Sequence, residues 1–316
     1  MTDTPAHRSG FACVVGRPNV GKSTLTNAMV GEKVAIMSAR PQTTRHTIRG
    51  IVHRENAQLI LVDTPGLHRP KTLLGQRLND LVAGTLGEVD VIAFCMPADQ
   101  KVGPGDRFIA EQLAPLMIGR RSIPVVAVVT KADVVDRERL AEHLIAVDNL
   151  AVSLDRNWSA IIPVSAKDGY QVDELENLLI GYLPEGPELY PGGELTDEPE
   201  QLMVAELVRE AALEGVRDEL PHSLAVVVDE ILPRPGSGDE ADGVPELLDV
   251  HVSVYVERDS QKAIIIGRGG SRLREIGTTA RHGIEKLLGT RVYLNLHVKV
   301  AKDWQRDPKQ LRKLGF

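Results

Sequence analysis

Short apolar runs alternate with segments of helical periodicity over the first 183 residues of the chain. The runs are rich in β-branched residues and are bounded by Gly, Pro or Asp, which is typical of strands buried on both faces. We expect such strands at residues 11–15, 58–62, 89–95, 124–130 and 160–164, and an edge strand at residues 47–53. The segments between them predict helices at residues 22–30, 72–86, 106–117, 136–147 and 172–182. This order predicts an α/β fold with a doubly wound, mostly parallel sheet.

The pattern changes after residue 183. Residues 184–199 hold four prolines and three glycines without periodicity, which is typical of a linker. Beyond it the chain predicts a helix, two strands, two helices and a last strand, at residues 201–213, 223–232, 247–257, 261–266, 271–288 and 291–300. We therefore expect one domain at residues 1–183, a linker at 184–199, and a small α+β domain with a basic C-terminal tail at 200–316. The acidic connection at residues 233–245 has no assigned role.

Composition excludes several classes of protein. Apolar residues make up 42% of the chain, which is enough for a sizeable core, and two cysteines cannot form a disulfide framework or a four-ligand zinc site. Cys13 and Cys95 both lie in apolar runs, so we expect buried thiols. The N-terminus lacks the apolar stretch of a signal peptide, and no run reaches the roughly 18 apolar residues of a membrane-spanning helix. We expect a soluble cytoplasmic protein.

Charge is distributed unevenly along the chain. Residues 258–316 hold 14 Lys and Arg against 5 Asp and Glu, which is a net charge of +9. Because the whole chain has a net charge of −7, the first 257 residues must have a net charge of −16. Residues 184–249 alone hold 18 acidic and 3 basic side chains. A basic end on an acidic protein indicates a site for a polyanion confined to that end.

A phosphate-binding motif follows the first expected strand. It matches G-x-x-x-x-G-K-[ST] at every fixed position and comprises Gly16, Arg17, Pro18, Asn19, Val20, Gly21, Lys22 and Ser23, with Thr24 next in the helix. Glycines let backbone N–H groups surround phosphates, and the helix N-terminus adds positive potential. We expect Lys22 to reach the β- and γ-phosphates and the Ser23 hydroxyl to bind Mg²⁺. The motif predicts a nucleotide site without specifying the base.

Three further motifs follow the carboxyl ends of expected strands. They are Asp63-Thr64-Pro65-Gly66, Thr130-Lys131-Ala132-Asp133 and Ser165-Ala166-Lys167. An Asp at position 63 can hold Mg²⁺ through water, and the Gly66 N–H can meet a γ-phosphate. The Asp133 carboxylate can accept two hydrogen bonds from guanine, which adenine cannot donate. A backbone N–H of the Ser165-Ala166-Lys167 segment can contact the guanine oxygen, and the set together predicts a guanine-nucleotide site.

These motifs resemble, in order, the signature of the translation-factor-related GTPases. One departure is Thr130, where Asn is commoner, and we expect it to alter the tethering of this loop and to keep the guanine preference. The resemblance implies a switch threonine that ligates Mg²⁺ when the γ-phosphate is present. It favours Thr44, which precedes the basic Arg45, although Thr43 remains open.

The group that promotes hydrolysis is less evident. Lys22, Thr44 and Gly66 are the expected catalytic contacts, but Leu67 stands where Ras-like enzymes have a water-orienting Gln. An apolar side chain cannot orient water. Relatives with Asn at the position of Asn19 often use a K⁺ ion, so Asn19 is either a K⁺ ligand or a residue that shapes the loop. Arg45 and His46 are weaker candidates for chemistry.

The second domain carries a basic G-x-x-G turn between two expected helices. The turn is Gly267-Arg268-Gly269-Gly270, and Arg272, Arg274 and Arg281 continue the basic surface. In KH domains such a loop clamps about four nucleotides of single-stranded RNA. A G-x-x-G turn alone is weak evidence, but the α-β-β-α-α-β order matches the type II KH arrangement.

The two domains together resemble the Era family of bacterial GTPases over nearly the whole chain. The likeness rests on residues 16–23, 41–46, 63–68, 219–223, 298–300 and 311–316. It implies a GTPase that binds GTP, GDP and Mg²⁺, binds the 3′ end of small-subunit (16S) rRNA, and assists assembly of the small ribosomal subunit. The resemblance also implies weak contact with the inner face of the membrane, and we expect a monomer. The alternatives are an RNA tether with negligible hydrolysis and a related GTPase with another RNA client.

Overall fold

A computed structural model describes residues 6–38, 43–70, 72–119, 122–214, 216, 220–234 and 247–316. The chain divides into two compact units, one of residues 1–70 and 78–197 and the other of residues 71–77 and 198–316. Most of the acidic connection at 233–245 lies outside the described residues. No helix in the described part of the chain is both long and apolar enough to cross a membrane.

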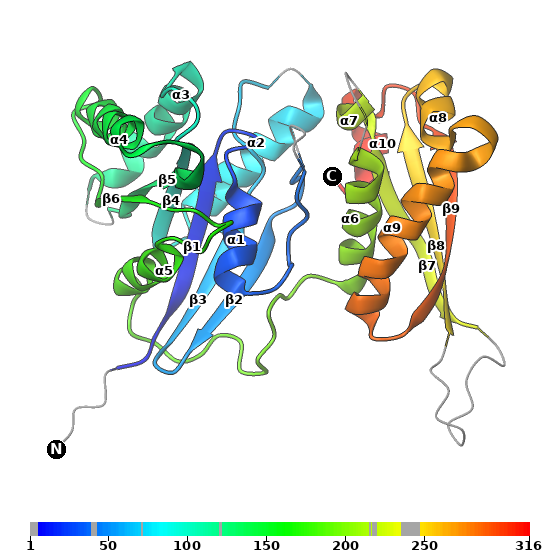
Figure 1. The fold of residues 1–316 in the computed structure, drawn as a ribbon, viewed down its shortest axis with the longest axis horizontal. Helices are drawn as coiled ribbons and strands as arrows, with labels where there is room; N and C mark the ends of the chain where they lie inside the picture. The colour runs from blue at the N-terminus through cyan, green and yellow to red at the C-terminus, as the bar shows by residue number, and fades with distance from the viewer. Residues whose placement is uncertain are drawn as a thin grey trace. The chain divides into compact units, whose positions relative to one another are not determined.

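The first unit is built on a six-stranded sheet with the order β2-β3-β1-β4-β5-β6 (Figure 1). All neighbouring strands are parallel except β2 and β3, which form an antiparallel hairpin at one edge. The strands are β1 (Arg8–Gly16), β2 (Ile48–Arg54), β3 (Ala57–Asp63), β4 (Val91–Pro97), β5 (Val125–Thr130) and β6 (Ala160–Pro163). The predicted α/β fold is therefore confirmed, including the edge strand.

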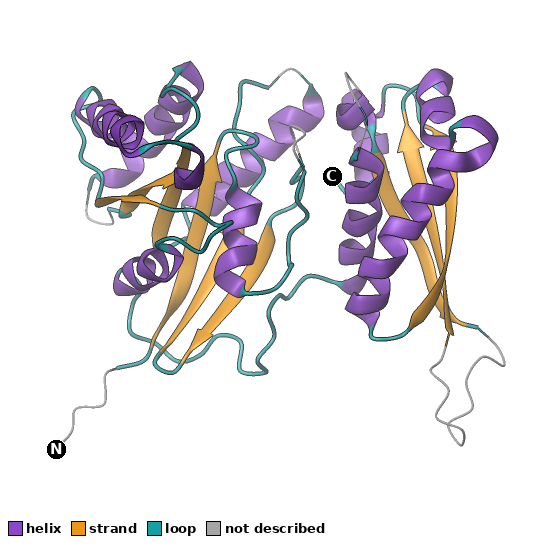
Figure 2. Cartoon of the chain, in the orientation of Figure 1, coloured by secondary structure: helices purple, strands orange, loops and turns teal. Residues whose placement is uncertain are grey.

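Helices cover both faces of this sheet, as the continuous apolar strands require (Figure 2). The helices are α1 (Lys22–Val30), α2 (Leu73–Leu86), α3 (Pro104–Leu113), α4 (Arg137–Val152) and α5 (Val172–Gly181). Helices α1 and α5 pack on one face, and α2, α3 and α4 pack on the other. Cys13 and Cys95 are buried free thiols within these cores, as predicted. Burial raises the pKa of the Cys95 thiol to about 12.

The topology collects the sequence motifs at one edge of the sheet. Parallel strands present their carboxyl ends at the same edge, which is where ligands bind in this class of fold. Strand β1 ends at Gly16, β3 at Asp63, and β5 at Thr130, and β6 leads into Ser165. Residues separated by more than a hundred positions in the chain thus face one site.

The segment after α5 forms a strap along the edge of the first unit, at residues 184–197. Gln58 holds it with both ends of its side chain: Oε1 accepts the N–H groups of Leu189 and Tyr190, and Nε2 donates to the Tyr190 carbonyl. The Ile51 N–H, on the open edge of β2, donates to the carbonyl of Leu195 at 2.8 Å.

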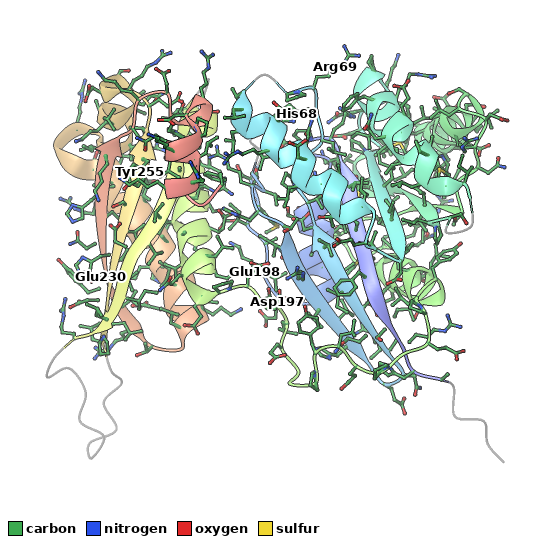
Figure 3. All side chains as sticks on the ribbon, turned by 180° about the vertical axis from the view of Figure 1, so that it is seen from behind. His68, Arg69, Asp197, Glu198, Glu230 and Tyr255 are labelled. Atoms are coloured by element: carbon green, nitrogen blue, oxygen red, sulfur yellow. The ribbon has the colours of Figure 1, made fainter. Side chains whose placement is uncertain are left out.

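The strap ends at an ion pair. The Asp197 carboxylate accepts hydrogen bonds from the Arg49 guanidinium at 2.9 Å and the Tyr190 hydroxyl at 2.8 Å (Asp197 is labelled in Figure 3). Arg49 belongs to β2, which follows the segment that contains Thr44. Most of the segment expected to be a linker is therefore hydrogen-bonded to the first unit.

The second unit packs helices on one face of a three-stranded sheet of order β7-β8-β9. Strands β7 and β8 are antiparallel, and β8 and β9 are parallel. The elements are α6 (Glu200–Leu213), α7 (Leu220–Ser223), β7 (Ala225–Pro233), β8 (Leu247–Val256), α8 (Asp259–Ile266), α9 (Ser271–Leu288) and β9 (Arg291–Val300). Apart from the short α7, this is the predicted type II KH order. Tyr255 and Glu230 lie on the sheet of this unit (Figure 3).

The basic C-terminal tail is folded against the second unit. It forms a short 3-10 turn, Trp304–Arg306, and helix α10 (Pro308–Lys313). The Trp304 indole is fully buried, donates to the Ser223 carbonyl at 2.9 Å, and stacks on Phe316. Burial of Trp304 and Leu311 explains why this charged segment has a fixed structure.

We expect Trp304→Ala to lower the free energy of unfolding of the second unit by about 3–5 kcal/mol, because it leaves a cavity where the indole was buried. Urea unfolding followed by circular dichroism measures the change. Trp158 lies in the first unit and is the only other tryptophan, so its fluorescence should keep the wild-type midpoint. The matched variant Trp158→Ala should destabilise the first unit instead. A wild-type circular dichroism transition for Trp304→Ala would contradict this account.

Candidate functional site

The phosphate loop links β1 to α1 and depends on its two fixed glycines. A Cβ on Gly16 would lie 2.6 Å from the carbonyl oxygen of Cys95, and Gly21 has a left-handed backbone with φ 98°. Lys22 is the first residue of α1, and its side chain is buried. Its Nζ donates to the carbonyls of Gly16 and Arg17, at 3.3 and 3.1 Å. Burial lowers the pKa of the Lys22 ammonium, and the nearby Asp63 carboxylate opposes that shift.

Two hydroxyl groups and a carboxylate converge beside Lys22. The Ser23 hydroxyl donates to Asp63 Oδ2 at 2.6 Å and lies 2.9 Å from Thr44 Oγ1. Thr44 Oγ1 lies 3.4 Å from the same carboxylate oxygen. Burial raises the pKa of Asp63 to about 6, although Lys22, Ser23 and Thr44 all act to lower it.

This cluster has the donor chemistry of a magnesium site. Mg²⁺ is a hard cation that takes oxygen ligands and keeps several waters, usually beside substrate phosphates. The second oxygen of Asp63, Oδ1, is buried and has no hydrogen-bond partner among the residues that the structure describes. A water bound to Mg²⁺ would satisfy it. The residues present therefore fit the expected ion.

The two candidate switch threonines have different surroundings. Thr44 lies in the cluster with Ser23 and Asp63, and its side chain is buried. The Thr43 hydroxyl donates to the carbonyl of Ser38 at 3.4 Å. This geometry favours Thr44, as the sequence did. The adjacent Arg45 is 1% exposed, which favours a structural role for its guanidinium.

The loop after β3 packs tightly on the phosphate loop. A Cβ on Gly66 would lie 2.6 Å from the backbone nitrogen of Pro18, so only glycine fits there. The Thr64 hydroxyl donates to the Val14 carbonyl at 2.7 Å. Leu67 is buried in the core, and its N–H donates to the Gly16 carbonyl. Leu67 therefore cannot orient a water molecule, in agreement with the sequence analysis.

The loops expected to recognise guanine lie at the same edge. The Thr130 hydroxyl donates to the Val20 carbonyl at 2.5 Å and so ties this loop to the phosphate loop. Lys131 has a left-handed backbone, and its ammonium pairs with Asp99 at 3.3 Å. The Asp133 carboxylate is exposed in the following turn.

The Ser165 loop is joined to this turn through the backbone. The Ala132 N–H donates to the Val164 carbonyl at 3.1 Å. Ser165 is buried, and its hydroxyl accepts the N–H of Asp168. Ala166 and Lys167 follow it at the rim of the site.

The second unit has a groove that begins at the G-x-x-G turn. Gly267, Gly269 and Gly270 all have positive φ, and a Cβ on Gly269 or Gly270 would meet open space. The groove has a volume of about 390 Å³ and runs between α9 and β9. Its lining comprises Gly270, Leu273, Arg274, Gly277, Thr278, Arg281, Val292, Tyr293, Leu294 and Leu296. An apolar floor with a cationic rim suits unstacked bases and a phosphate backbone.

The basic residues around the turn have different contacts. Arg268 and Arg274 are exposed, whereas the Arg272 guanidinium donates to the carbonyls of Ala212 and Glu214 at the end of α6. The Arg272 guanidinium therefore caps the C-terminal end of α6. The groove floor on β9 was not predicted from the sequence, although the alternation of Val292, Leu294 and Leu296 was an available signal.

Comparison with protein families matches both units. A family described as "50S ribosome-binding GTPase" matches residues 11–131, and the KH domain family matches residues 219–305. GTPase Era of Streptomyces coelicolor is 67% identical over 310 residues, covering 98% of this chain and 95% of that protein. GTPase Era of Mycolicibacterium smegmatis is 64% identical, covering 98% of this chain and 99% of that protein.

Two solved structures share the whole architecture. A variant of Aquifex aeolicus Era bound to GDP and AlF4⁻ is 37% identical, with a TM-score of 0.88, and covers 98% of this chain and 99% of its own. Era in complex with MgGDPNP and nucleotides 1506–1542 of 16S ribosomal RNA is 38% identical, with a TM-score of 0.87 and the same coverage.

We expect Thr44→Ala to weaken binding of GDPNP with Mg²⁺ by roughly tenfold and to leave GDP affinity nearly unchanged, because the hydroxyl is expected to act only with the γ-phosphate. Titration with fluorescent analogues of both nucleotides measures the two affinities. Thr43→Ala is the matched control and should leave both near wild type. The reverse result would assign the switch role to Thr43.

Proposed function

Because the chain belongs to the Era family of GTPases, we propose that it hydrolyses GTP at the edge of the first sheet and binds small-subunit ribosomal RNA in the groove of the second unit. The convergence of Ser23, Thr44 and Asp63 beside Lys22 is the observation that carries the nucleotide assignment. The GDP and MgGDPNP complexes of its structural relatives support GTP, GDP and Mg²⁺ as ligands.

We propose a distinct role for each part of the nucleotide site. Lys22 and the loop N–H groups bind the phosphates, and Gly66 meets the γ-phosphate from the opposite side. Ser23 and Thr44 ligate Mg²⁺, and Asp63 holds it through water. Asp133 pairs with guanine, and the Ser165 loop contacts the guanine oxygen through a backbone N–H. Bound Mg²⁺ would offset phosphate charge during the reaction.

The proposed RNA ligand is the 3′ region of 16S rRNA, in the service of small-subunit assembly. The groove in this chain has the apolar floor and exposed arginines that single-stranded RNA requires. The complex of a 38% identical relative with nucleotides 1506–1542 of 16S rRNA supports this choice of RNA. We further propose that RNA affinity depends on the bound nucleotide, which makes hydrolysis a switch.

The catalytic group is proposed to be a monovalent cation held near Asn19. Buried Leu67 supplies no polar atom for water, so hydrolysis needs another source of positive or orienting groups. Asn19 is exposed in the phosphate loop with a left-handed backbone. The same buried leucine favours the second candidate function, an RNA tether with negligible intrinsic hydrolysis.

We also propose a cellular location and an oligomeric state for the protein. We place the protein in the cytoplasm as a monomer, with weak contact of its basic end to the inner face of the membrane. Sedimentation of the protein with anionic vesicles at low and physiological salt tests the membrane contact.

Gly270→Asp should weaken binding of the 1506–1542 RNA fragment by about tenfold or more, because a carboxylate at the turn repels the phosphate backbone. GTP turnover should stay near wild type. Gly289→Asp is the matched control, since Gly289 also has positive φ and open space but does not line the groove. RNA affinities measured with GDP and with GDPNP test the switch in the same experiment. Wild-type RNA binding by Gly270→Asp would remove the turn from the interface, and equal affinities in the two nucleotide states would remove the switch.

Replacing K⁺ by Na⁺ should slow GTP turnover of the wild-type protein, and Asn19→Ala should abolish that difference. Phosphate release at constant ionic strength measures it. Turnover that is equally slow in both salts would favour the tether.

A further inference from the structure

Asp106 is a buried carboxylate at the start of α3, outside the motifs of the nucleotide site. Its side chain is 1% exposed. One oxygen, Oδ2, accepts the N–H of Gly103 at 2.9 Å and so caps the helix. The other oxygen, Oδ1, accepts a hydrogen bond from Nε of Arg17 at 2.7 Å. The carboxylate thus joins α3 to the phosphate loop across 89 positions of sequence.

Arg17 is held on more than one side. Its Nη1 donates to Oε1 of Gln100 at 3.1 Å, in the turn that precedes α3. A Cβ on Gly105 would lie 2.5 Å from Arg17 Cδ, so the arginine stem lies directly against the helix start. The phosphate-binding motif places no demand on the side chain at this position. The phosphate-binding motif therefore does not explain why the Arg17 side chain makes these contacts.

The backbone of Arg17 supplies that reason. An ammonium group has three N–H donors. Lys22 uses two of them on the carbonyls of Gly16 and Arg17, so these carbonyls fix the direction of the third. Pro18 follows Arg17 and restricts its backbone to extended conformations. Fixing the Arg17 side chain thus helps to fix the carbonyl that orients Lys22.

We propose that Asp106 is a positioning residue for GTP binding: acting through Arg17, it holds the carbonyl that aims the Lys22 ammonium at the phosphates. The inference rests on the proposed phosphate-binding role of Lys22. It adds a residue of α3 to the determinants of nucleotide affinity, and that residue contacts no nucleotide itself.

Asp106→Asn separates this role from helix capping. An asparagine retains one oxygen that can accept the Gly103 N–H, and its amide then presents N–H groups to the Nε–H of Arg17. We expect GTP and GDP affinities to fall by about tenfold, which corresponds to about 1.4 kcal/mol. Discrimination between GTP and XTP should remain as in wild type, because the guanine loops are untouched.

A second ion pair in the same unit provides the stability control. Glu176 is 3% exposed at its side chain and pairs with the half-exposed Arg54, joining β2 to α5. Glu176→Gln should lower the free energy of unfolding about as much as Asp106→Asn does, and it should keep wild-type GTP affinity. A role of Asp106 in folding alone would make the two variants behave alike in nucleotide binding.

A double-mutant cycle tests the route through Arg17. Arg17→Met should weaken GTP binding about as much as Asp106→Asn, and the double variant should be no worse than either single variant. Additive losses would overturn the proposal, as would wild-type GTP affinity for Asp106→Asn.

Lys22→Ala separates this inference from the site assignment. Lost GTP binding by Lys22→Ala with wild-type binding by Asp106→Asn would overturn only the positioning role. Wild-type binding by Lys22→Ala would overturn both.

Discussion

Asp63 carries a fully buried carboxylate, and the residues around one of its oxygens supply hydrogen bonds and an opposite charge. Removing an ion from water costs several kcal/mol unless hydrogen bonds and an opposite charge replace the solvent. Ser23, in the first turn of α1, and Thr44, in the segment before β2, approach the same oxygen, and Lys22, next to Ser23, provides the opposite charge. The phosphate loop, the switch segment and the end of β3 are therefore coupled through one side chain.

Local spacing was sufficient to predict that the four motifs meet at one edge of the first sheet. The phosphate motif spans eight consecutive residues, and each other motif directly follows an apolar strand. Parallel topology then brings the strand ends together, so the position of Asp133 relative to Lys22 needs no long-range information. The KH order was predictable for the same reason, because each of its elements has its own periodicity.

Adjacent residues and distant contacts were not predictable in this way. The following Arg45 favours Thr44 over Thr43 in the sequence, but only the path of the backbone places Thr44 Oγ1 2.9 Å from the Ser23 hydroxyl. The Gln58 side chain binds backbone groups of the strap, and backbone groups leave no trace in a sequence pattern. The charge of Arg272 is evident in the sequence and predicts an RNA contact, whereas the helix carbonyls to which it donates are not evident there.

The strap covers the open edge of β2, and it therefore determines where a fragment that contains only the first unit has to end. The Ile51 N–H faces outward from the last strand of the sheet, and Leu195 satisfies it. A chain cut after residue 183 would lose that cover and present a bare strand edge, on which other chains can assemble by edge-to-edge pairing. The first unit as a stand-alone fragment thus extends to residue 197, and proteolysis within the strap would expose the edge of β2 to pairing with other chains.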